Sequence, residues 1–166
     1  MAVTKLALDE CIRTYDMEII RKSSIESKAS ALLNTSAIVI SLLNSFIAFI
    51  VVGKITFNNF GILIILNIIA TFLILISIYW ALDVLKVKNH FIPFEIKNPN
   101  NISTKLNKNE ENLLAELMDD YLVIIPKIYK FNNAKLISLN SSMSYLIKGI
   151  FISFIGMIIT LLINGG

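Results

Sequence analysis

The stretch ITFNNFGILIILNIIATFLILISIYWAL, residues 55–82, decides the fold class of this chain. It contains no Asp, Glu, Lys or Arg. Because a helix rises about 1.5 Å per residue, about 20 apolar residues cross the roughly 30 Å of hydrocarbon in a bilayer. The stretch therefore predicts a transmembrane helix.

Two further stretches, residues 29–53 and 149–166, are also free of charged side chains. In the whole chain of 166 residues, 55% are hydrophobic and only 16% are charged, and the mean hydropathy is +0.72. Soluble domains are more polar than this. The sequence predicts an all-α membrane protein with about three transmembrane helices.

Basic residues indicate how the helices are oriented. Residues 1–28 contain Lys5, Arg13, Arg21, Lys22 and Lys28, and residues 83–148 contain nine Lys, whereas the loop between the first two spans contains only Lys54. Basic residues collect on the cytoplasmic side of membrane proteins. We expect the N-terminus inside and the C-terminus outside, and the N-terminal residues lack the apolar run of a secretory signal peptide.

Apolar and charged residues alternate with helical spacing outside the spans. The pattern predicts a cytoplasmic amphipathic helix over residues 1–28 and a second one over residues 110–140, in which Pro126 should produce a kink or an end. Between them we expect a transmembrane hairpin at 29–84 and a cytoplasmic loop at 85–109. The third span follows at 141–166.

The sequence offers little for catalysis or metal binding. Cys11 is the only cysteine and His90 the only histidine. One subunit can therefore form neither an internal disulfide nor a Cys/His zinc cluster, and the commonest general base is almost absent. We expect no enzyme activity, no catalytic residue, no metal and no cofactor. The net charge of +3 reads as a membrane topology signal and not as a surface for reading duplex nucleic acid.

Small and polar residues form a row along the first span. They recur three or four residues apart, which places them on one helix face: Ser23, Ser27, Ser30, Asn34, Ala37, Ser41, Asn44 and Ala48. We call this row the seam. Its members Asn34, Ser41 and Asn44 either line a narrow uncharged pore in a homo-oligomer or pack against other helices.

The other two spans carry shorter rows of the same kind. The second span has Asn67, Ala70, Ser77 and Ala81, and the third has Gly149, Ser153 and Gly156. Small residues let helices approach closely in lipid. Helix packing is the favoured interpretation for these two rows.

Six basic residues flank the spans. If they gather at the membrane surface they suit a phosphate-bearing ligand, and the alternative is anchoring at anionic lipid head groups. They are Arg21, Lys22, Lys28, Lys127, Lys130 and Lys135.

Two short motifs resemble the SLATT and Pycsar-type transmembrane effectors of prokaryotic anti-phage systems. One is the junction ESKASALL at residues 26–33, and the other is a helix led by Tyr121 with Asn132, Asn133 and Lys135 near its end. With the two spans between them the resemblance covers most of the chain, although residues 89–109 have no counterpart. The chain departs from two-span members of these families in having a third span and no separate sensor domain.

The resemblance implies a homo-oligomer, for which a tetramer is our working stoichiometry, in the prokaryotic inner (cytoplasmic) membrane. It implies a multi-pass effector that opens a pore during infection, controlled by a nucleotide or oligonucleotide signal from a partner nucleotidyltransferase. Two alternatives stay open: a membrane scaffold or regulatory subunit without a channel, and a holin-like lesion former.

Overall fold

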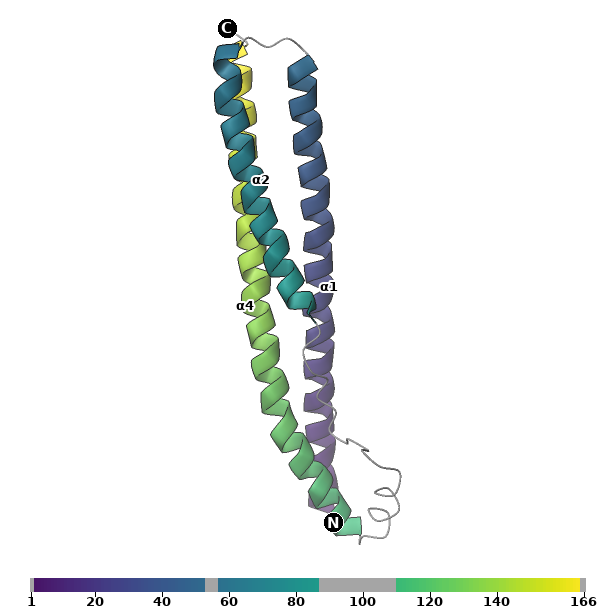
Figure 1. The fold of residues 1–166 in the computed structure, drawn as a ribbon. Coiled ribbons are helices and arrows are strands. Elements are labelled where there is room, and N and C mark those ends of the chain that lie inside the picture. Colours follow the sequence, from purple (N-terminus) through teal and green to yellow (C-terminus); the bar gives the residue numbers. More distant parts are fainter. Residues whose placement is uncertain (1, 53–56, 87–109, 165–166) are drawn as a thin grey trace. The chain divides into compact units, whose positions relative to one another are not determined.

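The computed structural model describes residues 2–52, 57–86 and 110–164, and this part of the chain is helical almost throughout. Its three helices are α1 (Ala2–Val52), α2 (Phe57–Leu85) and α4 (Glu110–Asn164) (Figure 1). Each contains a segment that is long and apolar enough to cross a membrane. The all-α fold is confirmed, and three such helices are compatible with a multi-pass membrane protein. The expected loop at 85–109 lies, apart from its first two residues, outside the described residues.

Within the described residues, helix α1 extends to Val52. Helix α4 continues through Pro126, so the proline does not end it. With 51 and 55 residues, α1 and α4 are far longer than the about 20 residues that cross a bilayer. Both therefore have room for a segment outside the hydrocarbon.

The described residues divide into two compact units. The first unit comprises residues 2–25 and 110–134, and the second comprises 26–52, 57–86 and 135–164. The divisions fall within α1 after Ile25 and within α4 after Ala134, whereas the sequence pattern suggested divisions after Lys28 and Asn140. Both α1 and α4 contribute residues to each unit.

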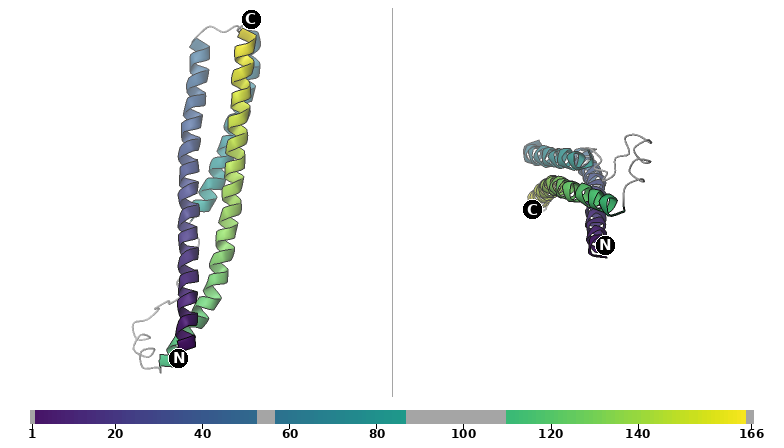
Figure 2. Two further views of the ribbon diagram at one scale, coloured as in Figure 1. Left: turned by 180° about the vertical axis from the view of Figure 1, so that it is seen from behind. Right: turned by 90° about the horizontal axis from the view of Figure 1, so that it is seen from below.

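In the second unit, α2 packs against α4 in the antiparallel direction (Figures 1 and 2). Going along α4, Ser138 bonds to Asp83, Ser142 bonds to Ser77, and Gly149 lies against Ala70. Rising numbers on α4 thus meet falling numbers on α2. The buried apolar side chains between the three helices of this unit are Ala29, Leu63, Ala70, Ile74, Ala81, Val84, Leu139 and Leu146.

Gly149 sets the closeness of this contact. A Cβ at this position would lie 2.7 Å from Cγ1 of Ile74 and 3.1 Å from the carbonyl oxygen of Ala70. Both distances are too short for a side-chain carbon, so only glycine fits without a shift of the helices. Close approach at a small residue is a common way for helices to associate in lipid, where hydrophobic burial between helices contributes little.

The outer surface of the second unit is strongly apolar. Ile38, Leu42, Phe72 and Phe154 are each at least half exposed. A soluble domain rarely exposes so many large apolar side chains on contiguous helices. Such a surface suits lipid as its solvent.

In the first unit, α1 and α4 pack side by side (Figure 2). Leu8 and Ile128 are buried, and the rings of Tyr15 and Tyr121 meet edge to face with centroids 5.5 Å apart. Burial is the largest cause that raises the pKa of both phenols above the usual value of 10.0. Tyr121 raises the pKa of Tyr15 further, and the Asp16 carboxylate raises the pKa of both. Both tyrosines are therefore neutral at physiological pH.

Candidate functional site

The seam of the first span faces away from the helices of its own chain. All eight seam residues, from Ser23 to Ala48, are exposed. The opposite side of α1 carries the buried residues Ile25, Ala29 and Ser36. The seam is therefore a strip of small and polar residues on the outer surface of α1, where Ser24, Lys28, Thr35 and Ser45 are exposed as well.

Asn34, Ser41 and Asn44 lie within the charge-free part of α1. Among the described residues, the side chains of these three make no hydrogen bond. An amide in hydrocarbon without a partner is unfavourable by a few kcal/mol, on the order of 2–7. The three residues need water or another protein surface beside them.

The rows in the other two spans lie inside the second unit. Ala70, Ser77 and Ala81 are buried on α2, and Gly149 and Gly156 are buried on α4, with Ser153 partly buried. Ser77 and Ser142 form a reciprocal pair: each hydroxyl donates to the other residue's carbonyl oxygen, at 2.7 and 2.9 Å. These rows face neighbouring helices of the same chain, in contrast to the seam.

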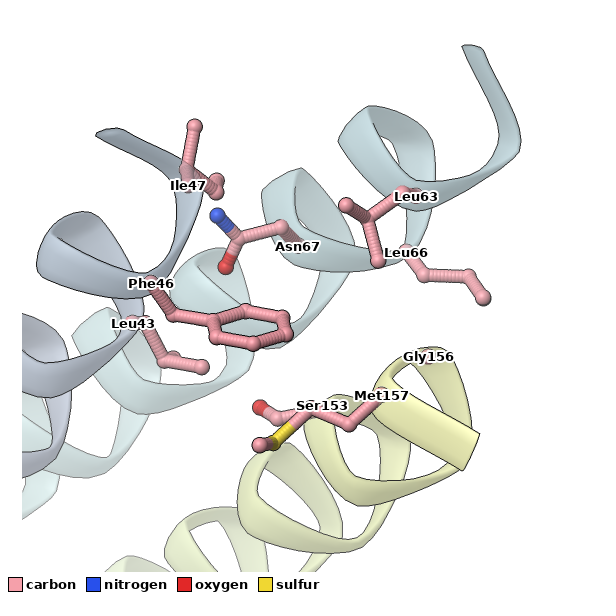
Figure 3. A pocket seen from close by; sticks show the side chains of 9 residues that line it. All are labelled: Leu43, Phe46, Ile47, Leu63, Leu66, Asn67, Ser153, Gly156 and Met157. Carbon is pink, nitrogen blue, oxygen red and sulfur yellow. The ribbon is translucent and has the colours of Figure 1, made fainter. Parts of the chain in front are cut away.

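A small cavity lies among the three helices near the ends of the spans (Figure 3). Its volume is about 10 Å³, and its polar lining residues are Asn67 and Ser153. Ser153 donates to the carbonyl oxygen of Gly149 at 2.8 Å, whereas the buried Oδ1 of Asn67 accepts no hydrogen bond within the described part of the chain. A cavity of this size has room for about one water molecule. It is too small for any larger ligand.

In the first unit, the predicted ligand-binding residue Arg21 is occupied by internal contacts. Its guanidinium donates to Oδ1 of Asn133 at 2.7 Å, lies 3.4 Å from the Glu18 carboxylate, and lies 5.3 Å from the ring centroid of Tyr129. The fully buried Asn132 donates from Nδ2 to the carbonyl and carboxylate oxygens of Glu18, both at 2.8 Å. These contacts join α1 to α4.

In the second unit, Lys135 also has an internal partner. Its side chain is only 5% exposed, and its ammonium forms an ion pair with the Glu26 carboxylate. Lys28 of this unit is exposed, as are Lys127 and Lys130 of the first unit, and Lys22 is partly buried. Of the six predicted phosphate-binding residues, the three exposed lysines are the most available to a ligand.

The internal contacts also explain the two motifs behind the family resemblance. Glu26 of the junction pairs with Lys135 in the second unit, while Asn132 and Asn133 bond to residues of α1 in the first unit. In each unit the motif residues connect α1 with α4. The polar groups of these motif residues therefore serve to pair the two helices.

Lys148 is a residue that the sequence pattern did not single out. It lies within the expected third span at 141–166 and directly precedes the charge-free stretch 149–166. Its neighbour Gly149 contacts Ala70 and Ile74, which lie in the middle of the charge-free stretch of α2. Lys148 is exposed, and its ammonium lies 5.3 Å from the ring centroid of Tyr145. The level of Lys148 follows from the register between α4 and α2. The sequence of one helix alone does not give this register.

The described part of the chain contains no group of three His, Cys, Asp or Glu side chains placed to hold a metal ion. Comparisons of the chain with protein families, with curated proteins and with solved structures gave no match.

Proposed function

We propose that this protein is an oligomeric, pore-forming membrane effector of prokaryotic anti-phage defence, controlled by a nucleotide signal from a partner nucleotidyltransferase. The observation that supports pore formation is the outward-facing seam. Asn34, Ser41 and Asn44 are exposed in a charge-free part of α1, beside Thr35 and Ser45, whose hydroxyls donate to carbonyl oxygens of the same helix. Identical copies that turn these residues toward a shared axis surround a narrow polar path with them.

The lining of such a path is uncharged at Asn34, Ser41 and Asn44. Without a ring of acidic or basic groups at these positions, a path lined by amides and hydroxyls discriminates weakly between ions, and it closes by dewetting or helix rotation. Leakage of the membrane potential is the expected consequence of opening.

The defence role and the nucleotide control rest on the resemblance of the two motifs. A nucleotide ligand requires accessible cations, and Lys28, Lys127 and Lys130 are the exposed members of the basic set. Arg21 and Lys135 are engaged by Glu18, Asn133 and Glu26. In this proposal the segments preceding the spans of α1 and α4 are the cytoplasmic part that receives the signal.

The test is ion leak from liposomes that contain the purified protein, with and without cyclic and linear oligonucleotides. The parent protein should conduct, and Asn44→Leu should abolish conduction because it replaces an amide on the path with an apolar side chain. The fold of each copy should stay unchanged, since Asn44 makes no hydrogen bond within the described part of its own chain.

The matched control is Asn140→Leu, the same change at an exposed residue of α4 that lies beside an outer groove between α1 and α4, away from the seam. This variant should conduct like the parent. Equal conduction by the two leucine variants would refute the seam as a pore lining. A tight membrane under every condition would instead favour the scaffold without a channel.

A further inference from the structure

We propose that, in the assembled membrane protein, Lys148 of one copy lies against the Asn34–Ser41–Asn44 seam of the next copy. This inference rests on the self-association in the proposed function but not on conduction. It describes the closed assembly, because seam residues that Lys148 covers do not line an open path. It assigns the exposed Lys148 face and the exposed seam to one interface between two copies of this chain.

The first step is the depth of Lys148. Ser138 of α4 donates to the Asp83 carboxylate at 3.0 Å, and the nearby Glu26–Lys135 pair marks the same polar level. Lys148 lies ten residues beyond Ser138, about 15 Å further along the helix. The four-carbon stem of a lysine spans only part of that distance, so the ammonium stays within the apolar layer.

The second step is the unfavourable environment that lipid alone would provide. A lysine at the centre of a transmembrane helix is unfavourable by about 2.5–3.5 kcal/mol even on the most lenient scale. The Tyr145 ring beside the ammonium offers partial compensation and no hydrogen-bond acceptor on its face. Charged residues inside membranes face protein or water, and within its own unit Lys148 faces outward. Another molecule must cover it.

The third step is the level of the seam. The Glu26–Lys135 pair aligns α1 with α4, and the cavity that Leu43 and Phe46 share with Ser153 continues the same parallel alignment. Lys148 is thirteen residues beyond Lys135, and thirteen residues beyond Glu26 on α1 is Val39. Ser41 is therefore nearly level with Lys148, and Asn34 and Asn44 lie within about 8 Å of that level. Copies inserted in the same orientation keep these depths in any lateral arrangement.

The fourth step excludes contact within one copy. The side of α1 that borders α4 carries Val39, Leu42 and Phe46, which line an outer groove together with Ile150 and Phe154. The seam lies on the other side of α1, and Lys148 lies on the side of α4 that faces away from this groove. The lysine and its own seam thus belong to separate faces of the second unit.

The two faces have complementary chemistry. An ammonium has three donors and no acceptor, while the amide and hydroxyl oxygens of the seam accept hydrogen bonds. Joining them satisfies the exposed amides and the exposed charge together. A contact between two different faces is heterologous and generates a ring when its rotation closes.

The test is disulfide trapping in membranes. Cys11→Ser provides a cysteine-free background, because Cys11 is the only cysteine. Two differently tagged copies, one with Lys148→Cys and one with Ser41→Cys, are expressed together and oxidised. The expected result is a mixed dimer in a yield several-fold above that of Lys148→Cys with Leu42→Cys. Leu42 is exposed at the same depth of α1 but lies on the groove side.

Ser41→Cys crosslinking to itself in preference to Lys148→Cys would overturn the proposal, as would equal yields with Leu42→Cys. Because Lys148→Cys also removes the charge, a second measurement uses uncrosslinked protein in nanodiscs. Lys148→Met should reduce assembly size and Lys148→Arg should preserve it. Assembly of Lys148→Met equal to that of the parent would overturn the proposal, whereas correct assembly without ion leak would refute only the pore.

Discussion

At the scale of single residues, glycines with the same chemistry have different roles in this chain. Gly149 lies against the backbone of α2, whereas a Cβ at Gly61 would meet no atom within 4 Å. At Gly156 the nearest atoms to an added Cβ lie at 3.6 Å, an ordinary van der Waals distance. The sequence predicted both Gly149 and Gly156 as packing residues. Only the structure shows that Gly149 leaves no room for a side chain, whereas Gly156 does.

We therefore expect Gly149→Ala to destabilise the second unit by about 1–3 kcal/mol, because the new methyl group forces Ile74 and the Ala70 carbonyl aside. Unfolding in detergent, followed by circular dichroism, measures the change. Gly61→Ala and Gly156→Ala are the matched controls and should stay within about 0.5 kcal/mol of the parent. Equal stability of all three variants would show that α2 and α4 do not approach as closely as described.

At the scale of the elements, one ion pair between α1 and α4 in the second unit is largely shielded from water on its lysine side. Lys135 is 5% exposed beside Glu26, while the pair Arg13–Glu10 within α1 has side chains that are 71% and 66% exposed. Water weakens the attraction of an exposed pair, and ordering two long side chains opposes it further. Of these two ion pairs, only Glu26–Lys135 should contribute appreciably to the pairing of α1 with α4.

A double-mutant cycle with Glu26→Gln and Lys135→Gln should give a coupling free energy of about 1.5–3 kcal/mol, the range of a hydrogen bond between charged groups. The same cycle with Glu10→Gln and Arg13→Gln should give about 0.5 kcal/mol or less. Urea unfolding in detergent micelles provides both values. Similar coupling free energies for the two pairs would contradict the prediction that the buried pair is the stronger one.

At the scale of the whole molecule, the described part of the chain contains three helices that are apolar enough to cross a membrane. Basic residues are concentrated before the apolar part of α1 and in residues 83–148, and the expected orientation rests on this distribution of charge. With the N-terminus inside, an N-terminal green fluorescent protein fusion should fluoresce, and a C-terminal alkaline phosphatase fusion should be active outside the cytoplasmic membrane. An inactive phosphatase with a fluorescent C-terminal fusion would place both ends inside.

The all-α class and three membrane-compatible helices could be predicted from the sequence, because hydropathy and helix length are properties of each segment alone. In contrast, the continuation of α4 through Pro126 was one of two outcomes that the sequence permitted.

The sequence by itself determined the seam as a row of residues on one helix face, because helical periodicity is local. Only the tertiary structure decided that this row faces outward while the rows of α2 and α4 face inward, since that choice depends on which faces the other helices cover. The level of Lys148 along α2 was decided in the same way. The Gly149 contact and the Ser77–Ser142 pair set the register of α4 on α2, and this register places Lys148 level with the middle of the charge-free stretch of α2.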